Sequence, residues 1–110
     1  MRKIDNVMAE KFIDAEPRNF NNTKVTVEDW IVRMYLHWNN ILSRPLEKKT
    51  DLTLNVPLDW QTKTTKSRIN TVFEMMAMPI KIISKKTVWL FEQPDWSHRD
   101  VLPWLNFVHM

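Results

Sequence analysis

The stretch KVTVEDWIVRMYLHW, residues 24–38, decides the fold, because two alternating runs meet in it at a polar dipeptide. Side chains at every second position of a strand point to the same face of a sheet. The apolar positions are Val25, Val27, Val32, Met34 and Leu36, and the other face of the second run carries Arg33, Tyr35 and His37. A tight connection at Glu28-Asp29 is therefore expected to join the two runs into an antiparallel β-hairpin.

Two further segments have helical spacing. The apolar residues within Ile4–Glu16 predict an N-terminal helix that ends before Pro17. The spacing i, i+3, i+4, i+7 from Ile69 to Met76 predicts a central helix with a threonine N-cap, because threonines precede it and a threonine hydroxyl accepts from free amides.

The remaining strands complete the predicted order. Alternation over Leu52–Leu58, after a charged loop at 44–51, predicts a third strand, and the runs Ile80–Ser84 and Thr87–Phe91 predict a second hairpin. The order is α-β-β-β-α-β-β plus a tail at 93–110 that is rich in Trp and Pro. We expect an α+β fold with an antiparallel sheet of about five strands, helices on one face, and a single domain over residues 1–110.

The chain has no glycine, although average usage of about 7% would supply about eight. Glycine normally supplies backbone that approaches a phosphate closely or adopts a positive φ. Its absence argues against glycine-rich phosphate loops, dinucleotide fingerprints and nucleophile elbows. The chain also has no cysteine, which excludes disulfides, thiol nucleophiles and thiolate metal sites.

Positive charge is concentrated in the middle of the chain. The net charge is +3, but residues 31–91 hold ten Lys or Arg against four Asp or Glu. The start of the central helix attracts phosphate through its free amides and its dipole. The candidate nucleic-acid-binding residues around it are Lys63, Lys66, Arg68, Lys81, Lys85 and Lys86, to which Arg33 and Tyr35 would add a stacking platform. The alternative is that these lysines only keep a strand edge soluble.

The tail supplies a second candidate function. Trp96, Trp104, Leu105 and Phe107 are large apolar residues of the kind that anchor protein interfaces. An exposed tail would bind a host or phage protein, whereas a tail that folds back would complete a small core. A homodimer that covers the tail would bury the same residues.

Catalysis has the weakest support. Asp95, His98, Arg99 and Asp100 lie close in sequence, but nothing fixes their geometry and a polar turn accounts for them. The three histidines show no metal-ligand spacing. We therefore expect no enzymatic activity, no metal, no cofactor and no small-molecule substrate. No apolar run reaches the ~20 residues of a membrane span, so no membrane partner is expected.

Several motifs occur in an order that resembles a group of small tailed-bacteriophage proteins. Those proteins carry Asn-Thr-x-Val-x-Val, matched by residues 22–27, then a Leu-His-Gly-Asn hairpin, matched by 36–39 with Trp38 at the glycine position. A tryptophan, matched by Trp60, precedes their Thr-Thr-x-x-Arg-x-Asn helix start, matched by 64–70, and a closing hairpin follows. The last hairpin here has Phe91-Glu92 where the group has Asn-Gly, and the tail is not matched.

The resemblance implies a phage protein in the host cytoplasm and implies no activity. Together with the charge pattern it predicts a non-catalytic accessory protein that binds nucleic acid through a basic face. Binding of a host or phage protein through the tail is the alternative.

Overall fold

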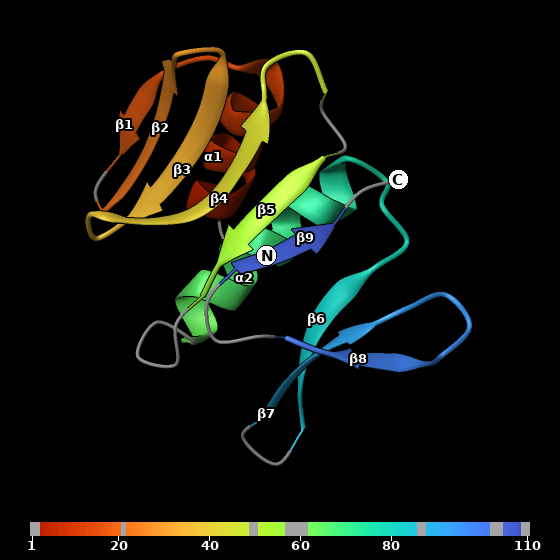
Figure 1. The fold of residues 1–110 in the computed structure, drawn as a ribbon. Helices are drawn as coiled ribbons and strands as arrows, with labels where there is room; N and C mark the ends of the chain where they lie inside the picture. Colours follow the sequence, from red (N-terminus) through yellow and green to blue (C-terminus); the bar gives the residue numbers. More distant parts are fainter. Residues whose placement is uncertain are drawn as a thin grey trace.

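The structure is a computed structural model that describes residues 3–20, 22–48, 51–56, 62–85, 88–101 and 105–108. Helices and strands are mixed along these residues, which confirms the predicted α+β class (Figure 1). The elements are α1 (Lys3–Asp14), β1 (Arg18–Phe20), β2 (Thr23–Glu28), β3 (Ile31–Leu36), β4 (Asn39–Pro45), β5 (Leu52–Asn55), α2 (Lys63–Met75), β6 (Lys81–Lys85), β7 (Val88–Glu92), β8 (His98–Asp100) and β9 (Leu105–Val108).

The larger sheet has the strand order β1-β2-β3-β4-β5-β9, and all of its neighbouring strands are antiparallel. The predicted first hairpin is its β2–β3 pair, in which Glu28 lies opposite Ile31 across a two-residue turn. The strand predicted from Leu52 ends at Asn55, and Pro57 and Leu58 lie outside the described residues. The predicted second hairpin is the β6–β7 pair of a smaller sheet, β6-β7-β8.

The described residues form more strands than the sequence predicts. β4 begins at Asn39 and includes Arg44, which the sequence places in a charged loop. The register between β3 and β4 shifts at a bulge, so Ile41 and Leu42 are both buried, and the alternation that marks a strand is interrupted. β1, β8 and β9 have only three or four residues each, which is too short for a clear period.

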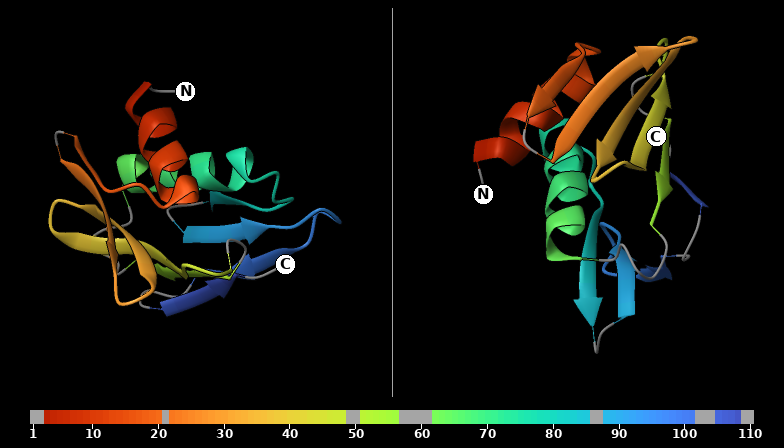
Figure 2. Two further views of the ribbon diagram at one scale, coloured as in Figure 1. Left: turned by 90° about the horizontal axis from the view of Figure 1, so that it is seen from above. Right: turned by 90° about the vertical axis from the view of Figure 1, so that its left-hand side faces the viewer.

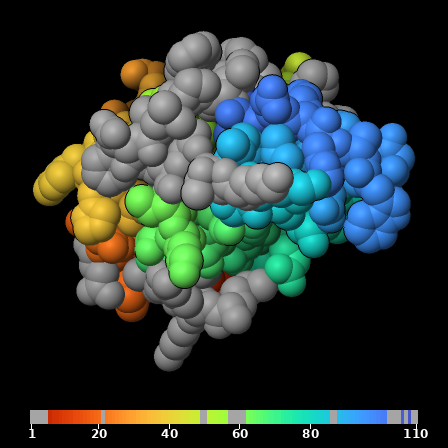
Figure 3. All heavy atoms as spheres, turned by 90° about the horizontal axis from the view of Figure 1, so that it is seen from below, coloured from red at the N-terminus to blue at the C-terminus, as the bar shows by residue number. Residues whose placement is uncertain are grey.

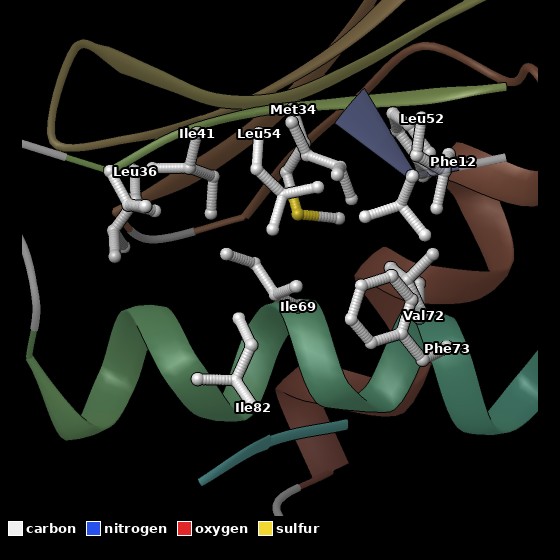
Figure 4. Packing of buried hydrophobic residues seen from close by; sticks show 14 of the residues in the cluster. Phe12, Met34, Leu36, Ile41, Leu52, Leu54, Ile69, Val72, Phe73 and Ile82 are labelled. Atoms are coloured by element: carbon white, nitrogen blue, oxygen red, sulfur yellow. The ribbon is translucent and has the colours of Figure 1, made fainter. Parts of the chain in front are cut away.

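Both helices lie on one side of the larger sheet (Figure 2). Buried apolar side chains of the helices and of the sheet's inner face form a cluster that also includes residues of the smaller sheet (Figure 4). Its labelled members are Phe12, Met34, Leu36, Ile41, Leu52, Leu54, Ile69, Val72, Phe73 and Ile82. Each such side chain contributes about 1.5–3 kcal/mol when it is buried, so this packing holds the fold together. We call the opposite face of the larger sheet, which points away from the helices, the outer face.

The helix α2 has the predicted threonine cap, and its Asn70 binds the backbone of β6. The Thr62 hydroxyl accepts from the Thr65 amide at 3.2 Å, so Thr62 is the N-cap. The Asn70 side chain donates to the Ile82 carbonyl at 2.9 Å and accepts from the Ile82 amide at 2.7 Å. These two bonds satisfy the backbone of β6 on the side away from β7, so they attach the smaller sheet to α2 and cover its edge.

Both helices end in a Schellman motif without glycine. At the end of α2, the Met78 amide donates to the Phe73 carbonyl at 2.9 Å and the Ala77 amide donates to the Glu74 carbonyl at 3.0 Å. The same pair of bonds ends α1 around Ala15. Ala15 and Ala77 both have φ of 55°, the left-handed conformation in which glycine is usual, at a cost of about 1–2 kcal/mol for any other residue.

Arg44 joins β4 to the end of α1 from inside the protein. Its side chain is 2% exposed, and its Nη2 atom donates to the carbonyls of Phe12 at 3.1 Å and Ile13 at 2.9 Å. Its Nη1 atom donates to the carbonyls of Pro45 and Leu46 at 3.0 and 3.2 Å. Burial lowers the pKa of Arg44, and the charge of Asp14 opposes that shift. Arg44 therefore satisfies carbonyls at a helix C-terminus, where the dipole also favours a cation.

Candidate functional site

The strand register places polar and aromatic side chains on the outer face of β1, β2 and β3. Asn19 pairs with Lys24, which pairs with Tyr35, and Thr26 pairs with Arg33 in the neighbouring row. Positions paired directly across antiparallel strands have side chains on the same face. Arg33 and Tyr35 therefore share a face with each other, as the alternation of β3 predicts, and the pairing with β2 adds Lys24 to that face, which points away from both helices.

A hollow of about 530 Å³ lies over these rows. We call it the sheet hollow, and its lining residues are Asn19, Asn22, Lys24, Thr26, Glu28, Tyr35, His37 and Trp38. Its volume falls in the range of sites that hold a small ligand or a part of a larger one. The hollow thus combines two aromatic rings, a cation, a carboxylate and several uncharged hydrogen-bonding groups.

The cations on this face are not neutralised by the part of the chain that the structure describes. Lys24 is exposed and Arg33 is half-buried, and within the described ranges neither forms an ion pair. Glu28 lies at the other end of β2 from Lys24, so the lining carries its positive charge near Tyr35 and Trp38. An anionic group would therefore be attracted to the end of the hollow where the aromatic rings lie.

Trp38 lies in a tight turn that normally requires glycine. Leu36 pairs with Asn39, so the β3–β4 turn has two central residues, His37 with φ of 48° and Trp38 with φ of 73°. Positive φ at both positions defines a type I′ turn, for which Asn-Gly is favoured. The Trp38 side chain is nevertheless 91% exposed. The position therefore combines a strained backbone with a large apolar side chain in water.

Trp30 and Trp96 share both properties. Trp30 has φ of 66° and is 73% exposed, and Trp96 has φ of 67° and is 78% exposed. Trp30 follows Asp29 in the β2–β3 turn, which has the same two-residue form. Neither residue lines the sheet hollow.

The six predicted nucleic-acid-binding residues do not share one environment. Lys63 and Lys66 lie in the first turns of α2, in the helical layer, and Lys85 is exposed at the end of β6. In the view of Figure 3, the start of α2 lies beside the smaller sheet. Lys81 has its Nζ atom 3.5 Å from a carboxylate oxygen of Glu92. Lys86 lies outside the described residues.

Arg68 is not part of an exposed basic face. Its side chain is 2% exposed, and its Nε atom donates to the Thr23 hydroxyl at 3.1 Å. Both residues belong to the motifs that resemble phage proteins, so this bond joins the two motifs, α2 to the start of β2. The sequence alone could not show whether Arg68 is buried or binds phosphate, because an arginine in the first turns of a helix is compatible with either role.

The stacking platform and the lysines also lie apart. Arg33 and Tyr35 are on the outer face of the larger sheet, whereas Lys63 and Lys66 are in the layer that covers its inner face. The predicted extension of the lysine face by Arg33 and Tyr35 is therefore wrong, because β3 turns those side chains away from α2.

Parts of the predicted protein-binding tail are incorporated in the sheets. Leu105 and Phe107 are residues of β9, which pairs with β5 through the backbone, and Trp104 lies outside the described residues. Trp96 instead borders a second hollow of about 630 Å³. We call it the Trp96 hollow, and its lining residues are Asn70, Glu74, Met78, Pro79, Ile80, Lys81, Glu92, Gln93, Pro94 and Trp96.

The polar residues near the tail are engaged with their neighbours. Asp95 accepts from the Ser97 hydroxyl and from the Ser97 amide, and these two bonds lower the pKa of Asp95. The His98 Nε2 atom is 3.6 Å from a Glu92 carboxylate oxygen, and the Arg99 guanidinium lies 4.8 Å from the centre of the Phe91 ring. Among the residues that the structure describes, no group of three or more His, Asp or Glu is placed to hold a metal ion.

Trp38 was not among the predicted site residues, although the sequence marks its position as unusual. Trp38 occupies the glycine position of the Leu-His-Gly-Asn motif, where it stands out as a departure from the pattern. Lys24 carries no such signal, because a lysine at a polar strand position is common. Only the pairing of β2 with β3 shows that Lys24 faces Tyr35.

The fold and the hollow define a small α+β protein with a polar and aromatic outer sheet face. The model of the Kyanoviridae Gp96 protein family matches residues 1–109, so the chain belongs to this family of phage proteins. The match includes the tail, which the motif resemblance did not cover. Searches of curated proteins and of solved structures returned no match. In the described part of the chain, no helix has the length and apolarity to cross a membrane.

Proposed function

We propose that this phage protein is a non-catalytic binding protein for nucleic acid in the host cytoplasm, and that the outer sheet face is its binding surface. The observation that supports the proposal is the sheet hollow, in which Tyr35 and Trp38 lie beside Lys24. Aromatic rings for bases, next to cations for phosphates, are the combination that nucleic-acid-binding sheets use.

The two kinds of group have separate roles in this proposal. Lys24 and Arg33 contact phosphates, so they supply affinity that does not depend on sequence and falls with salt. Tyr35 and Trp38 contact bases, and each stacked base adds about 1–3 kcal/mol. The uncharged side chains of Asn19 and Thr26 provide hydrogen-bonding groups between them.

The lysines of α2 form the competing site for the same ligand. Lys63 and Lys66 flank a helix N-terminus that favours phosphate, but the described structure places no aromatic platform with them. Two double variants separate the sites, because each removes two positive charges: Lys24→Gln with Arg33→Gln, and Lys63→Gln with Lys66→Gln.

Binding is measured by fluorescence anisotropy with labelled single-stranded DNA and RNA at about 50 and 200 mM salt. The proposal expects the outer-face double variant to weaken binding at low salt and to reduce the slope of log K against log salt by about 1.4, the value for two phosphate contacts on a single strand. The α2 double variant should bind like wild type. Loss of binding only in the α2 variant would move the site to the helix start, and no wild-type binding at low salt would reject the proposal.

Protein binding is the second candidate, and the Trp96 hollow favours it. Pro94 and Trp96 lie beside Met78 in its lining, and a tryptophan that is mostly exposed can anchor a partner. Deletion of the tail would remove β9 from the larger sheet, so Trp96→Ala is the better test. Proteins captured from host lysate by wild type and lost with Trp96→Ala would support this candidate, and identical captured sets would reject it.

A further inference from the structure

We infer that the sheet hollow takes single-stranded rather than double-stranded nucleic acid, with one unpaired base stacked on the indole of Trp38. The inference rests on the proposed function and names the ligand class of the same site. Three features of the Trp38 turn support it: its conformation, its hydrogen bonds and its place at the hollow.

The conformation shows that Trp38 does not serve the fold. Its φ of 73° is the left-handed conformation that glycine adopts without strain, and its side chain is 91% exposed, so it gives little to the core. Such a residue costs backbone strain and gains almost no stability from its ring, which stays in water on folding. Strained residues cluster at functional sites, and among the exposed tryptophans Trp30, Trp38 and Trp96 only Trp38 lines the sheet hollow.

The hydrogen bonds hold the turn in place before any ligand binds. The His37 amide donates to the Asn22 carbonyl at 2.9 Å, and the Asn22 Nδ2 atom lies 3.2 Å from His37 Nε2. The Asn39 side chain donates to the His37 carbonyl at 3.1 Å. Because these bonds hold His37 and the strand ladder pairs Asn39 with Leu36, binding orders only the indole side chain of Trp38, which lowers the entropic cost of binding.

The place of the ring determines which form of nucleic acid it can contact. Trp38 lines the sheet hollow together with Tyr35 and Lys24, so a base on the indole has its phosphates near a cation. In a duplex both faces of each internal base are covered by stacked neighbours, and exposing one requires unpairing and unstacking. An unpaired strand offers its base faces directly, so the aromatic lining selects a single strand.

Trp30 provides a matched control within the same sheet. It occupies the second position of a type I′ turn, has φ of 66° and is highly exposed, but it is not part of the hollow. Glycine at either position should relieve the same strain. Only the substitution at position 38 should affect the ligand.

The test uses the full chain with a labelled single strand of about twelve nucleotides and with the blunt duplex of the same sequence, at low salt. We expect wild type to bind the single strand at least about tenfold more tightly than the duplex. Trp38→Gly should weaken single-strand binding about tenfold or more, within the range of one lost stacking contact, while its melting temperature rises. Trp38→Phe should keep part of the affinity, and Trp30→Gly should raise the melting temperature without changing affinity.

The outcomes distinguish this inference from the proposed function. Equal affinity for duplex and single strand, or unchanged binding by Trp38→Gly, overturns the inference and leaves nucleic-acid binding intact. Absence of binding to both ligands overturns both. A fall in the melting temperature of Trp38→Gly would show that the ring serves the fold, and it would also overturn the inference.

Discussion

Replacement of Arg44 by methionine tests the main polar contact between the sheet and α1. Methionine fills a similar volume without any donor, so the carbonyls of Phe12 and Ile13 lose the guanidinium at the end of the helix. Each acceptor left buried without a partner costs about 1–3 kcal/mol. The loss of a cation at a partly buried helix C-terminus adds up to about 2 kcal/mol.

Two effects reduce this cost. The Phe12 carbonyl also accepts from the Ala15 amide at 3.4 Å, and methionine removes the penalty of burying a charge. We therefore expect the free energy of unfolding to fall by about 3 kcal/mol, with a drop in melting temperature of about 12 °C for a chain of this size. Arg44→Lys should lose about half as much, because one ammonium cannot replace both guanidinium Nη atoms, which donate to separate pairs of carbonyls.

The measurement is urea denaturation followed by tryptophan fluorescence and by circular dichroism. Arg33→Met is the control, since Arg33 is half-buried on the outer face, and it should change stability by no more than about 0.5 kcal/mol. A variant Arg44→Met that is as stable as wild type would show that desolvation of the cation cancels its hydrogen bonds, and it would refute the stabilising role assigned to Arg44.

Three further predictions concern the turns and caps. Ala77→Gly should stabilise the protein by about 0.5–1 kcal/mol in urea denaturation, because relief of about 1–2 kcal/mol of backbone strain exceeds the extra chain entropy of glycine. Asn70→Ala should destabilise it by about 2 kcal/mol through the two lost bonds to Ile82, and it should promote dimers in light scattering because the edge of β6 becomes free. Ser97→Ala should raise the pKa of Asp95 toward its usual value, as measured by NMR titration. Because the native pKa is lowered, the Asp95 turn contributes stability at neutral pH that is lost as the pH falls through that pKa. The variant should lose this contribution at a higher pH than wild type.

Matched variants give these predictions their controls. Ala9→Gly, inside α1, should destabilise by about 2 kcal/mol, because glycine weakens the helix and removes a buried methyl group, so the sign is opposite from the helix end. Glu74→Ala, on the exposed side of α2, should leave both stability and association unchanged. A destabilised Ala77→Gly, a monomeric and fully stable Asn70→Ala, or an unshifted Asp95 pKa would each contradict the corresponding account.

Elements with a long period were predictable, and short or interrupted ones were not. Helical spacing identified α1 and α2, and alternation identified the β2–β3 hairpin, because these runs are long enough to show one buried face. The β6–β7 hairpin was identified from two β-branched runs on either side of Lys85-Lys86. β4 was missed where its bulge places Ile41 and Leu42 both inside. The strands β1 and β8 pair with neighbours in the chain but are too short to show a period, whereas β9 pairs with β5, about fifty residues earlier, and no local pattern contains that information.

The candidate site divides in the same way. Alternation along β3 was enough to place Arg33 and Tyr35 on one face, but it could not say what lies beside them. Pairing with β2 adds Lys24, and the β3–β4 turn adds Trp38. Arg68 was wrongly included in the exposed basic face, because the sequence pattern of a cation near a helix start does not show whether it binds phosphate or a buried threonine.

What the amino-acid sequence determined by itself was the α+β class, the two helices and the hairpins, because those depend on periodicity and on residues close together in the chain. Tertiary structure alone decided which cations are buried and which face the solvent, and which aromatic side chain borders the hollow. The physical reason is that burial and hydrogen bonding of a side chain depend on its neighbours in space, and Arg44 meets α1, and Arg68 meets β2, only when the sheet and the helices are packed together.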